Sequence, residues 1–342
     1  HAGADRDECA VAGGHIALGR HHHGYVPEGD SDAGLSDRNT RILDSPFEGD
    51  FSECIKYKIG LCVSLKISHN NHRPHFLSSF CLTGLIFLWP SFALSADVSP
   101  ETEMSVSVGV SFLDFRYAEY DVDGGLLDYE NGFLPGLTLE ATRTENDWFV
   151  TGKLDYHAGD VLYDGQTQTG VAVVTRSDAI ILDVFFKFGR HFYVEGRPSY
   201  SLYGGVGHHY WHRAIRSIGA VSGLTEIYRW DYAALGLNHV LDEGDHHTWK
   251  IDLRIQRTLS PSMEFNTVQF PLAERNGTRI AFPWSRPLQK KQRLNIEPYY
   301  ERWELGRSPN REVILGGKTV SAFEPDSVTN NRGVIVSFTG AL

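Results

Sequence analysis

Apolar and polar residues alternate along most of the chain from residue 104 onward. The clearest example is Trp249 to Gln256, where odd-numbered residues are apolar and even-numbered residues are polar or charged. The same alternation recurs at residues 148–157, 180–187 and 294–301. Successive side chains of a β-strand point to opposite faces, so each segment is predicted to be a strand with one apolar and one polar face. No long segment carries the apolar stripe of an amphipathic helix, and the chain is therefore predicted to be all-β.

Ten such segments can be delimited in the sequence. They span residues 104–119, 134–144, 148–162, 174–189, 192–213, 226–241, 246–259, 278–288, 292–305 and 329–339. The eighth segment is the weakest, because Pro283 and Pro287 interrupt it and proline cannot donate a ladder hydrogen bond. The prediction is therefore about ten strands, with eight as the alternative count.

The connectors between these segments alternate in length. Short connectors follow the even-numbered segments, at residues 144–147, 189–191, 242–245 and 289–291. Long connectors follow the odd-numbered segments, at residues 120–135, 162–174, 214–226, 260–277 and 306–328. Membrane barrels of antiparallel strands have tight turns on the periplasmic side and long loops outside. An exported soluble β-sandwich binding protein is the alternative, since its strands also alternate where one sheet face packs on the core.

Two features favour the barrel over the sandwich. The polar strand faces carry opposite charges at positions where a dry sandwich core would not tolerate them. Aromatic residues also gather near strand ends, and an interfacial girdle needs such residues; among them are Trp148, Tyr210, Trp211, Trp230, Tyr232, Trp249 and Trp303. The predicted fold is a single transmembrane, antiparallel, up-and-down β-barrel.

A different pattern precedes the strands, at residues 65–96. Basic residues Lys66 and Arg73 come first, an apolar run from Phe76 to Phe92 follows, and small residues from Ala93 to Ala96 close the segment. This order is that of a secretory signal peptide, with a transmembrane helix as the alternative. The protein is therefore expected to be exported through a cleaved N-terminal signal peptide.

The remaining N-terminal residues, 1–64, are rich in Gly, Asp and His and show no period of 2 or 3.6. No Met precedes the signal peptide, so a natural start at a non-Met codon, Val63 or Leu65, is expected, with residues 1–64 a non-native or disordered extension. The whole-chain averages, 41% hydrophobic, 22% charged and a net charge of −11, mix these unlike segments. All four cysteines lie before residue 97, which excludes disulfides and Cys-ligated zinc from the barrel domain, residues 97–342.

This cysteine-free, alternating domain, which closes on Gly333 to Phe338, resembles the small outer-membrane β-barrels of Gram-negative bacteria, the porin-like and opacity-type group. The resemblance implies an outer-membrane location and contact with outer-membrane lipid and lipopolysaccharide. It also implies insertion by the barrel assembly machinery, which in that group reads an aromatic residue near the end of the last strand. Phe338 matches that residue, but Thr339 to Leu342 follow it, whereas the group usually ends on the aromatic.

If the apolar faces meet lipid, the polar faces line the barrel interior. The predicted lumen-lining residues carry both signs in nearly equal number: Asp114, Arg116, Glu140, Lys153, Asp155, Asp183, Lys187, Glu195, Arg197, Arg229, Asp231, Lys250, Asp252, Arg254, Glu297 and Glu301. A pore selective for one class of ion would show a ring of one sign, whereas this mixture predicts ion pairs across a narrow lumen. The predicted function is a structural or narrow-channel barrel with a charge-paired lumen and long extracellular loops.

Histidines are the weak candidates for a metal site. His208 and His212 share one face of a predicted strand, but they are too far apart to chelate one ion easily. A third ligand would have to come from His157 or Asp160, and packing at the barrel rim is the alternative role. No metal and no cofactor is therefore expected.

An outer-membrane enzyme is the alternative function. Barrels of this size include omptin proteases, which use paired acidic residues and a His-Asp couple at the extracellular rim, and lipid A hydrolases with a His/Ser-based site. The chain contains Asp245, His246, His247 and Ser201, but Asp245 and His247 fall in a short turn and hence on the periplasmic side. No Gly-x-Ser-x-Gly or His-Glu-x-x-His motif is present, so no enzyme is expected. A carboxylate and a histidine that converge at the outer rim would favour one.

The sequence also bears on other ligands. It holds no glycine-rich phosphate-binding motif and no basic patch, which argues against nucleotides and nucleic acid. Small solutes remain the candidate ligands of a channel.

Overall fold

The structure is a computed structural model that describes residues 102–342 except 168–169, 196, 245, 289–290 and 316–317. The predicted extension and signal peptide, residues 1–96, and the predicted turn residue Asp245 lie outside the described residues. The described elements are β1 (Thr102–Tyr120), β2 (Leu126–Glu145), β3 (Trp148–Gln166), β4 (Ala172–Val194), β5 (Arg197–Ile215), β6 (Leu224–Gly244), β7 (His247–Phe265), β8 (Val268–Pro271), β9 (Asn276–Ala281), β10 (Trp284–Pro287), β11 (Gln292–Leu305), β12 (Arg311–Leu315), β13 (Lys318–Ala322) and β14 (Asp326–Ala341). Within the described part of the chain, no helix is long and apolar enough to cross a membrane.

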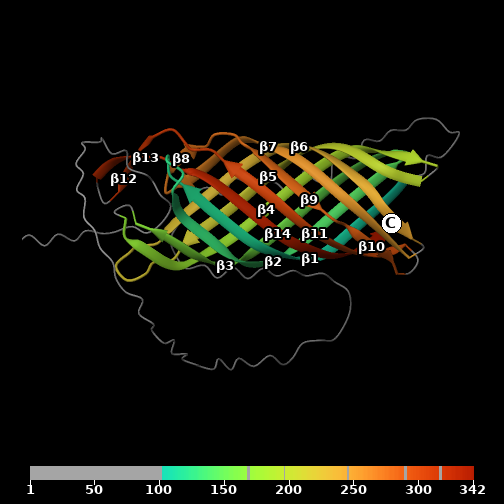
Figure 1. Ribbon diagram of the computed structural model, residues 1–342, viewed down its shortest axis with the longest axis horizontal. Helices are drawn as coiled ribbons and strands as arrows, with labels where there is room; N and C mark the ends of the chain where they lie inside the picture. Colours follow the sequence, from blue (N-terminus) through green and yellow to red (C-terminus); the bar gives the residue numbers. More distant parts are fainter. Residues whose placement is uncertain (1–101, 168–169, 196, 245, 289–290, 316–317) are drawn as a thin grey trace, which may run out of the picture. The chain divides into compact units, whose positions relative to one another are not determined.

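The strands close into a barrel. Strands β1 to β7 pair antiparallel in chain order, β9 and β10 together join β7 to β11, and β11 pairs with β14. Strand β14 pairs with β1 along its whole length, from Asp326 opposite Tyr120 to Ala341 opposite Ser105. Figure 1 shows these strands wound obliquely around one axis. The prediction of an all-β, antiparallel, ten-strand barrel is confirmed, and its weak eighth strand is the one divided at Pro283 into β9 and β10.

Several strands are longer, and their connectors shorter, than predicted. Residues 126–135, expected to belong to a long loop, are part of β2. Only residues 121–125 join β1 to β2. The turn predicted at residues 189–191 is also wrong, since β4 continues to Val194 and Glu195 takes the positive φ of 51° that a tight turn requires. The glycine that suggested this turn, Gly189, lies inside β4, where a Cβ would come within 2.7 Å of the Tyr203 side chain.

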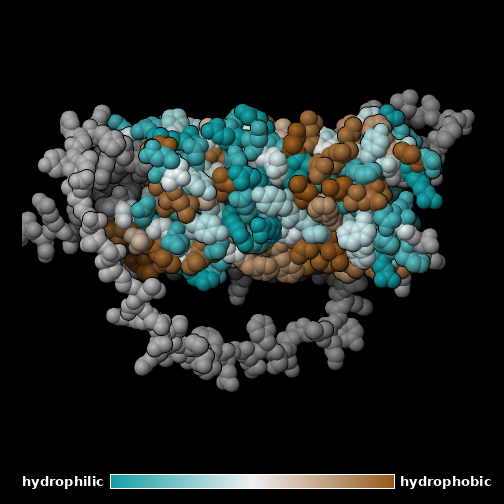
Figure 2. Space-filling model, in the orientation of Figure 1, coloured by the Kyte–Doolittle hydropathy of each residue, from teal (hydrophilic) through white to brown (hydrophobic). Residues whose placement is uncertain are grey.

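The outer face of the barrel differs between its two ends, which we name the short-turn end, near β10, and the loop end, near β12. Exposed apolar side chains form a belt toward the short-turn end: Val108, Val110, Leu137, Leu139, Val150, Leu154, Phe186, Phe188, Leu202, Val206, Leu235, Leu253, Ile255, Ile280 and Phe338. On the face seen in Figure 2, apolar residues gather over the right-hand part, where β10 lies, and hydrophilic residues form a band across the middle.

Toward the loop end, the outer face carries paired charges. The pairs are Arg116 with Asp114, Arg176 with Asp160, Arg216 with Asp178, His208 with Asp231, Arg229 with Glu264, Arg257 with Glu274, and Arg302 with Glu304. Strands of about 20 residues tilted by about 40° reach about 50 Å along the barrel axis, whereas a hydrocarbon core is about 30 Å thick. The barrel is therefore long enough to extend beyond the membrane, and the charged outer face belongs to the part that meets water.

The interior of the loop half is filled by large side chains. Residues Leu113, Phe115, Tyr117, Trp211, Tyr228, Trp230, Tyr232 and Trp303 belong to one buried apolar cluster. Trp211, Trp230, Tyr232 and Trp303 were predicted to join the interfacial girdle, and that prediction is wrong, because their places in the strand alternation turn them inward. Trp148 and Trp249 do lie on the outer surface near the short turns, stacked or tilted against Phe188 and Trp284.

Candidate functional site: the barrel interior

The short-turn half of the interior contains a polar cavity of about 360 Å³, which we name the vestibule. Hydroxyl and amide side chains line much of it; Asn295 Nδ2, for example, donates to Thr339 Oγ1 at 2.7 Å. Charged residues Glu140, Lys187 and Lys250 also face it. These groups are solvated in an open cavity, so the vestibule is suited to hold water and small polar solutes.

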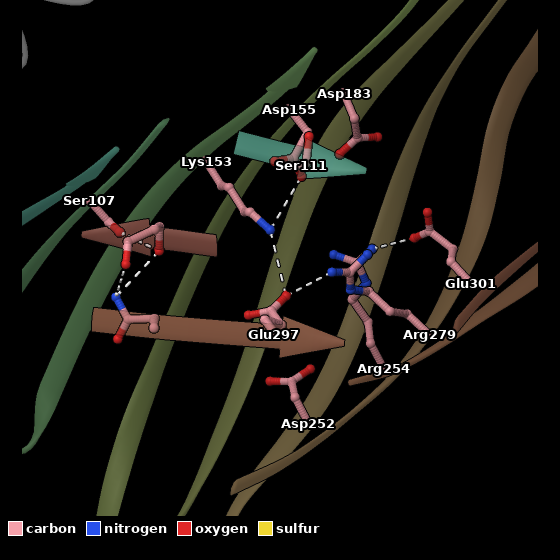
Figure 3. Close-up of polar contacts among 12 residues, drawn as sticks. Ser107, Ser111, Lys153, Asp155, Asp183, Asp252, Arg254, Arg279, Glu297 and Glu301 are labelled. Carbon is pink, nitrogen blue, oxygen red and sulfur yellow. Dashed lines mark hydrogen bonds and ion pairs between the residues drawn. The ribbon is translucent and has the colours of Figure 1, made fainter. Parts of the chain in front are cut away.

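Beyond the vestibule, six charged side chains form what we name the ion-pair layer: Lys153, Asp155, Arg254, Arg279, Glu297 and Glu301. Lys153 Nζ lies 3.2 Å from Asp155 Oδ2 and 3.7 Å from Glu297 Oε1. Arg279 Nη2 donates to Glu297 Oε1 at 2.8 Å, and Arg254 Nη2 donates to Glu301 Oε1 at 2.7 Å. Figure 3 shows these side chains pointing toward one another from the surrounding strands. The layer holds three cations and three anions, so its charge is balanced.

The ion-pair layer crosses the lumen. Lys153 comes from β3 and Glu297 from β11, and the strand order places these two strands on opposite sides of the barrel. The arginines are also held by aromatic rings, since Arg279 Cζ lies 3.8 Å from the ring centre of Tyr299 and Arg254 Cζ lies 4.7 Å from that of Phe185. The contact of Lys153 with Glu297 therefore bridges the lumen, and aromatic packing holds the two arginines beside it.

Two histidines lie beside this layer, around a small cavity of about 40 Å³. His157 Nε2 lies 2.9 Å from Ser111 Oγ, and His209 Nδ1 lies 3.0 Å from Asp183 Oδ2. Tyr232 also donates its hydroxyl to Asp183, at 2.9 Å. A cavity of this size has room for a few waters, so no large substrate fits beside these Ser-His and His-Asp contacts.

Next along the axis comes what we name the aromatic layer: Phe115, Tyr117, Trp211, Tyr228, Trp230, Tyr232 and Trp303. Trp211 of β5 packs against Tyr117 of β1, with ring centres 4.8 Å apart, and stacks on Tyr228 at 4.8 Å. Trp303 meets Trp230 at 5.5 Å. Because these rings come from strands on different sides of the barrel, they fill its cross-section with apolar surface.

At the loop end lies what we name the Arg213 cluster: Arg213, Glu119, Asp128, Glu130, Glu226 and Glu324. The side chains of Arg213 and of its four ion-pair partners are fully buried. The guanidinium donates to Glu119, Asp128, Glu130 and Glu226 at distances of 2.7 to 2.8 Å. Glu324 accepts from Tyr228 Oη at 2.5 Å. One cation thus faces five carboxyl groups.

The structure places most of the predicted lumen-lining residues inside the barrel. Glu140, Lys153, Asp155, Asp183, Lys187, Lys250, Asp252, Arg254, Glu297 and Glu301 line the vestibule or the small cavity beside the ion-pair layer. Glu195 and Arg197 are exposed at the ends of the turn between β4 and β5.

Four predicted lumen residues lie on the outer face, which corrects the prediction. Asp114 and Arg116 pair with each other there because their neighbours Phe115 and Tyr117 turn inward. Arg229 and Asp231 are likewise outside, because Tyr228, Trp230 and Tyr232 fill the interior. The physical reason is that the outer face near the loop end meets water, so polar residues there do not mark the lumen.

The structure separates the weak metal candidates from their proposed third ligands. His208 and His212 are on the outer face of β5, where His208 Nδ1 lies 2.7 Å from Asp231 Oδ1. His157 is inside the barrel on Ser111, and Asp160 pairs with Arg176. Among the residues that the structure describes, no group of three His, Cys, Asp or Glu side chains is positioned to hold a metal ion.

Sequence reasoning missed the Arg213 cluster and the aromatic layer. The signal was present in the alternation of β5, where His209, Trp211 and Arg213 share one face, and in β6, where Glu226 and Tyr228 do. A charged residue on the same face as large aromatic residues is unusual for a lipid-facing surface. That combination could have marked these faces as interior.

Comparisons with known proteins concern the fold alone. The chain matches no protein-family model and no curated protein by sequence. Among solved structures, it is similar to the outer membrane protease OmpT from Escherichia coli, at 8% identity and a TM-score of 0.48, over 72% of this chain and 99% of that one. It is also similar to the outer membrane protein OprG from Pseudomonas aeruginosa, at 11% identity and a TM-score of 0.31, over 71% and 97%. A third similar structure is the outer membrane protein AlkL in DMPC lipid bilayers, at 12% identity and a TM-score of 0.31, over 73% and 95%.

The assignment of the chain follows from its own strands and surfaces. Among the described strands, β14 pairs with β1, and β9 and β10 join β7 to β11, so the sheet closes into a ring, which is the condition for a β-structure to cross a membrane. This barrel carries an apolar belt outside and polar, charged groups inside, with tight turns at one end. The chain is therefore a transmembrane β-barrel protein of the outer-membrane type.

Proposed function

We propose that this protein is an outer-membrane barrel whose lumen is closed at rest, so that it acts as a structural barrel or a narrow, weakly conducting channel. The observation that carries the proposal is the contact of Lys153 from β3 with Glu297 from β11, which links opposite walls of the barrel. The aromatic layer and the Arg213 cluster add two further obstructions behind it. In the described lumen, the vestibule offers about 360 Å³ of room for solutes, and it ends at the ion-pair layer.

Conductance tests this proposal. The purified full-length protein, refolded and reconstituted into planar bilayers, is expected to show no large and stable single-channel current. A large, stable conductance of the unaltered protein would mean an open porin and would overturn the proposal.

A paired variant sharpens the test. Lys153→Ala together with Glu297→Ala removes the bridge across the lumen while it leaves the net charge of the layer unchanged. The matched control is Arg143→Ala with Glu145→Ala, an ion pair of the same net charge on the outer face of β2. Current should rise in the first variant and stay at the unaltered level in the second, because only the first pair obstructs the lumen.

Export and contacts with the envelope are part of the proposal. The signal-like segment, residues 65–96, supports export and cleavage near Ala96. Phe338 is 60% exposed on the outer face of the last strand, which supports contact with lipid and with the assembly machinery. N-terminal sequencing of the protein recovered from outer membranes should give a start close to Asp97, and a start upstream of residue 65 would contradict this part.

We also propose that the protein is not an enzyme. One observation favours an enzyme: His208 and Asp231 form a histidine-carboxylate contact of 2.7 Å in the loop half. That pair faces away from the lumen, whereas the carboxylates inside the loop end are buried around Arg213. Peptide and lipid A hydrolysis by the purified protein tests this, and an activity that His208→Ala abolishes would overturn it.

A further inference from the structure

The Arg213 cluster has fewer hydrogen-bond donors than its carboxyl groups require. Arg213 supplies four hydrogen bonds, one each to Glu119, Asp128, Glu130 and Glu226. Each of these carboxyls keeps its second oxygen buried and without a partner. If every carboxyl were ionised, five negative charges would face one positive charge in a site that water does not reach. Such an excess of buried charge is strongly unfavourable, so the cluster must bind protons.

The contacts of Tyr228 show where a proton is missing. Its hydroxyl oxygen lies 2.5 Å from Glu324 Oε1, 3.2 Å from Glu226 Oε2 and 3.2 Å from the hydroxyl oxygen of Tyr117. The hydroxyl of Tyr117 is itself directed at Glu119, at 2.8 Å. A phenol has one hydrogen, so Tyr228 cannot donate to both carboxyls. If it donates to Glu324, the 3.2 Å approach to Glu226 Oε2, which accepts from Arg213, has no hydrogen from the phenol, and a proton on one of the two carboxyls would supply it.

One further buried group points to the same need. The second oxygen of Glu324 is buried with no hydrogen-bond partner. Groups of this kind are rare in folded proteins, and a bound proton supplies the donor that the carboxyl oxygens lack.

Glu324 differs from the other four carboxyls in its origin. Glu119, Asp128, Glu130 and Glu226 lie on barrel strands, whereas Glu324 belongs to the connector between β11 and β14, whose described residues, 306–315 and 318–325, contain β12 and β13 and are named the lid. Figure 1 shows β12 and β13 at the loop end of the barrel.

The lid is held to the barrel by packing and by hydrogen bonds around Glu324. Val313 and Ala322 belong to the same buried cluster as the aromatic layer. Within the lid, the amide of Ser308 donates to the Glu324 carbonyl at 2.9 Å, and the Ser308 hydroxyl accepts from the Glu324 amide at 2.8 Å. The contact of Glu324 with Tyr228 is thus a direct polar link between the lid and the barrel wall.

We propose that the Arg213 cluster is a proton-binding site, and that a proton held on Glu324 latches the lid onto the loop end of the barrel. Loss of that proton gives Glu324 a negative charge, the fifth in the cluster. The other four carboxylates are fixed on barrel strands and cannot move away from it. The lid then opens, because Glu324 reaches water only when its segment leaves the barrel. This inference goes beyond the proposed function and does not depend on whether the lumen conducts.

The direction of the pH dependence follows from the groups around Glu324. The cluster that Glu324 joins is formed by Glu119 and Tyr117 from β1, Asp128 and Glu130 from β2, Tyr163 from β3, Arg213 from β5, and Glu226 and Tyr228 from β6. Burial, and then repulsion by Glu119 and Glu226, raise the pKa of the Glu324 carboxyl well above its ordinary value, and Arg213 offsets only part of this. An acid whose pKa is higher in the closed state binds protons more tightly there. The closed lid is therefore most stable at acid pH and loses stability as the pH rises above the ordinary carboxyl pKa.

Cysteine accessibility tests the latch. The four native cysteines all lie before residue 97, so they are replaced by serine, and a single cysteine is placed at Ala322, a fully buried lid position. A second chain carries its cysteine at the exposed neighbour Ser321 and corrects for the intrinsic pH dependence of the thiol. The measured quantity is the ratio of maleimide labelling rates, Ala322→Cys over Ser321→Cys, between pH 5 and pH 9 in refolded protein. The ratio is expected to rise by about tenfold or more. A difference of one unit in the Glu324 pKa between the closed and the open lid changes the opening equilibrium tenfold.

Two further variants decide the outcome. Glu324→Gln, which keeps the shape but cannot ionise, is expected to hold the ratio low and flat across the pH range. Glu312→Gln, an exposed lid carboxyl, should leave the rise unchanged. A ratio that does not change with pH in the parent chain, or a rise that persists in Glu324→Gln, overturns the proposal. The shift in electrophoretic mobility between heated and unheated barrel checks that each variant is folded, and a variant that fails this check is replaced by Glu324→Met, for which the same flat ratio is expected.

Discussion

The ion-pair layer and the Arg213 cluster are both charged, buried and inside the same barrel, yet their charges are arranged in opposite ways. In the ion-pair layer three cations face three anions, and the side chains keep between 9 and 28% of their surface exposed. In the Arg213 cluster one cation faces five carboxyls, and the ion-paired side chains have no exposed surface. The charges of the first region cancel one another, although Asp155 Oδ1 and Arg254 Nε lack hydrogen-bond partners there, whereas the charges of the second cancel only with protons added.

This difference separates two ways of closing a barrel. A balanced layer keeps its pairs over a wide range of pH, because no member needs to change its protonation. An unbalanced cluster is coupled to pH, because its stability depends on protons taken from solution. The described polar link of Glu324 joins the lid to the second region, so closure of the lumen and closure of the lid should respond to different conditions.

The largest expected effect is the loss of the single cation of the cluster. Arg213→Met removes four hydrogen bonds and leaves the carboxyls without a positive partner, so we expect a loss of about 3–5 kcal/mol in the free energy of unfolding. Urea unfolding of the refolded barrel measures it. Arg254→Met in the ion-pair layer is the comparison, and it should cost less because Arg279 remains close to Glu301. Equal losses at the two positions would remove the distinction between the regions.

Neutralising one carboxyl in each region should give unequal results. Glu297→Gln leaves Lys153 and Arg279 without their shared anion, and we expect it to lower the free energy of unfolding by about 1–3 kcal/mol. Glu226→Gln replaces a carboxyl that competes with four others for Arg213, and its amide oxygen can still accept from the guanidinium. We expect a change within about 1 kcal/mol, of either sign. A large loss from Glu226→Gln at neutral pH would mean that all five carboxyls are ionised.

Hydrogen exchange should separate the regions by their dependence on pH. The Glu324 amide donates to Ser308 in the lid, whereas the Glu301 amide lies in β11 at the ion-pair layer. Because the closed lid holds a proton on Glu324, its opening free energy should fall by up to about 1.4 kcal/mol for each pH unit above the ordinary carboxyl pKa. After correction for intrinsic exchange rates, protection of Glu324 should decline between pH 5 and pH 8 while protection of Glu301 stays constant. A parallel decline at both amides would indicate global loosening of the barrel.

The smallest effect is expected on the outer face. Arg229 pairs with Glu264 at 2.8 Å, but both side chains are about 40% exposed. Solvent screens such a pair, so Arg229→Ala should cost no more than about 1 kcal/mol, far less than Arg213→Met. Urea unfolding under the same conditions provides the measurement. A cost above that of Glu297→Gln would place Arg229 inside the barrel, as the sequence had suggested.

The alternation of apolar and polar residues was sufficient to predict the barrel, its ten strands and the interruption at Pro283. The alternation also placed five charged residues inside the lumen: Lys153, Asp155, Arg254, Glu297 and Glu301. These residues lie where the outer face meets lipid, so the polar face must point inward. In that part of the barrel the outer face must be apolar because it meets lipid. The alternation therefore determines which face of each strand points into the lumen.

Near the loop end the alternation does not determine which face of a strand points inward. Both faces can carry polar residues there, because the barrel is surrounded by water. Asp114 and Arg116 point outward there while Phe115 and Tyr117 fill the interior, and only packing across the lumen decides this.

The Arg213 cluster depends on the tertiary structure to a still greater degree. Arg213 meets Glu130 across 83 positions of sequence and Glu119 across 94, and Tyr228 meets Glu324 across 96. Local sequence determined that each of these residues lies on a strand or in a connector and which neighbours share its face. Closure of the barrel brought five carboxyls to one guanidinium, because strands distant in sequence become opposite walls of the same narrow lumen.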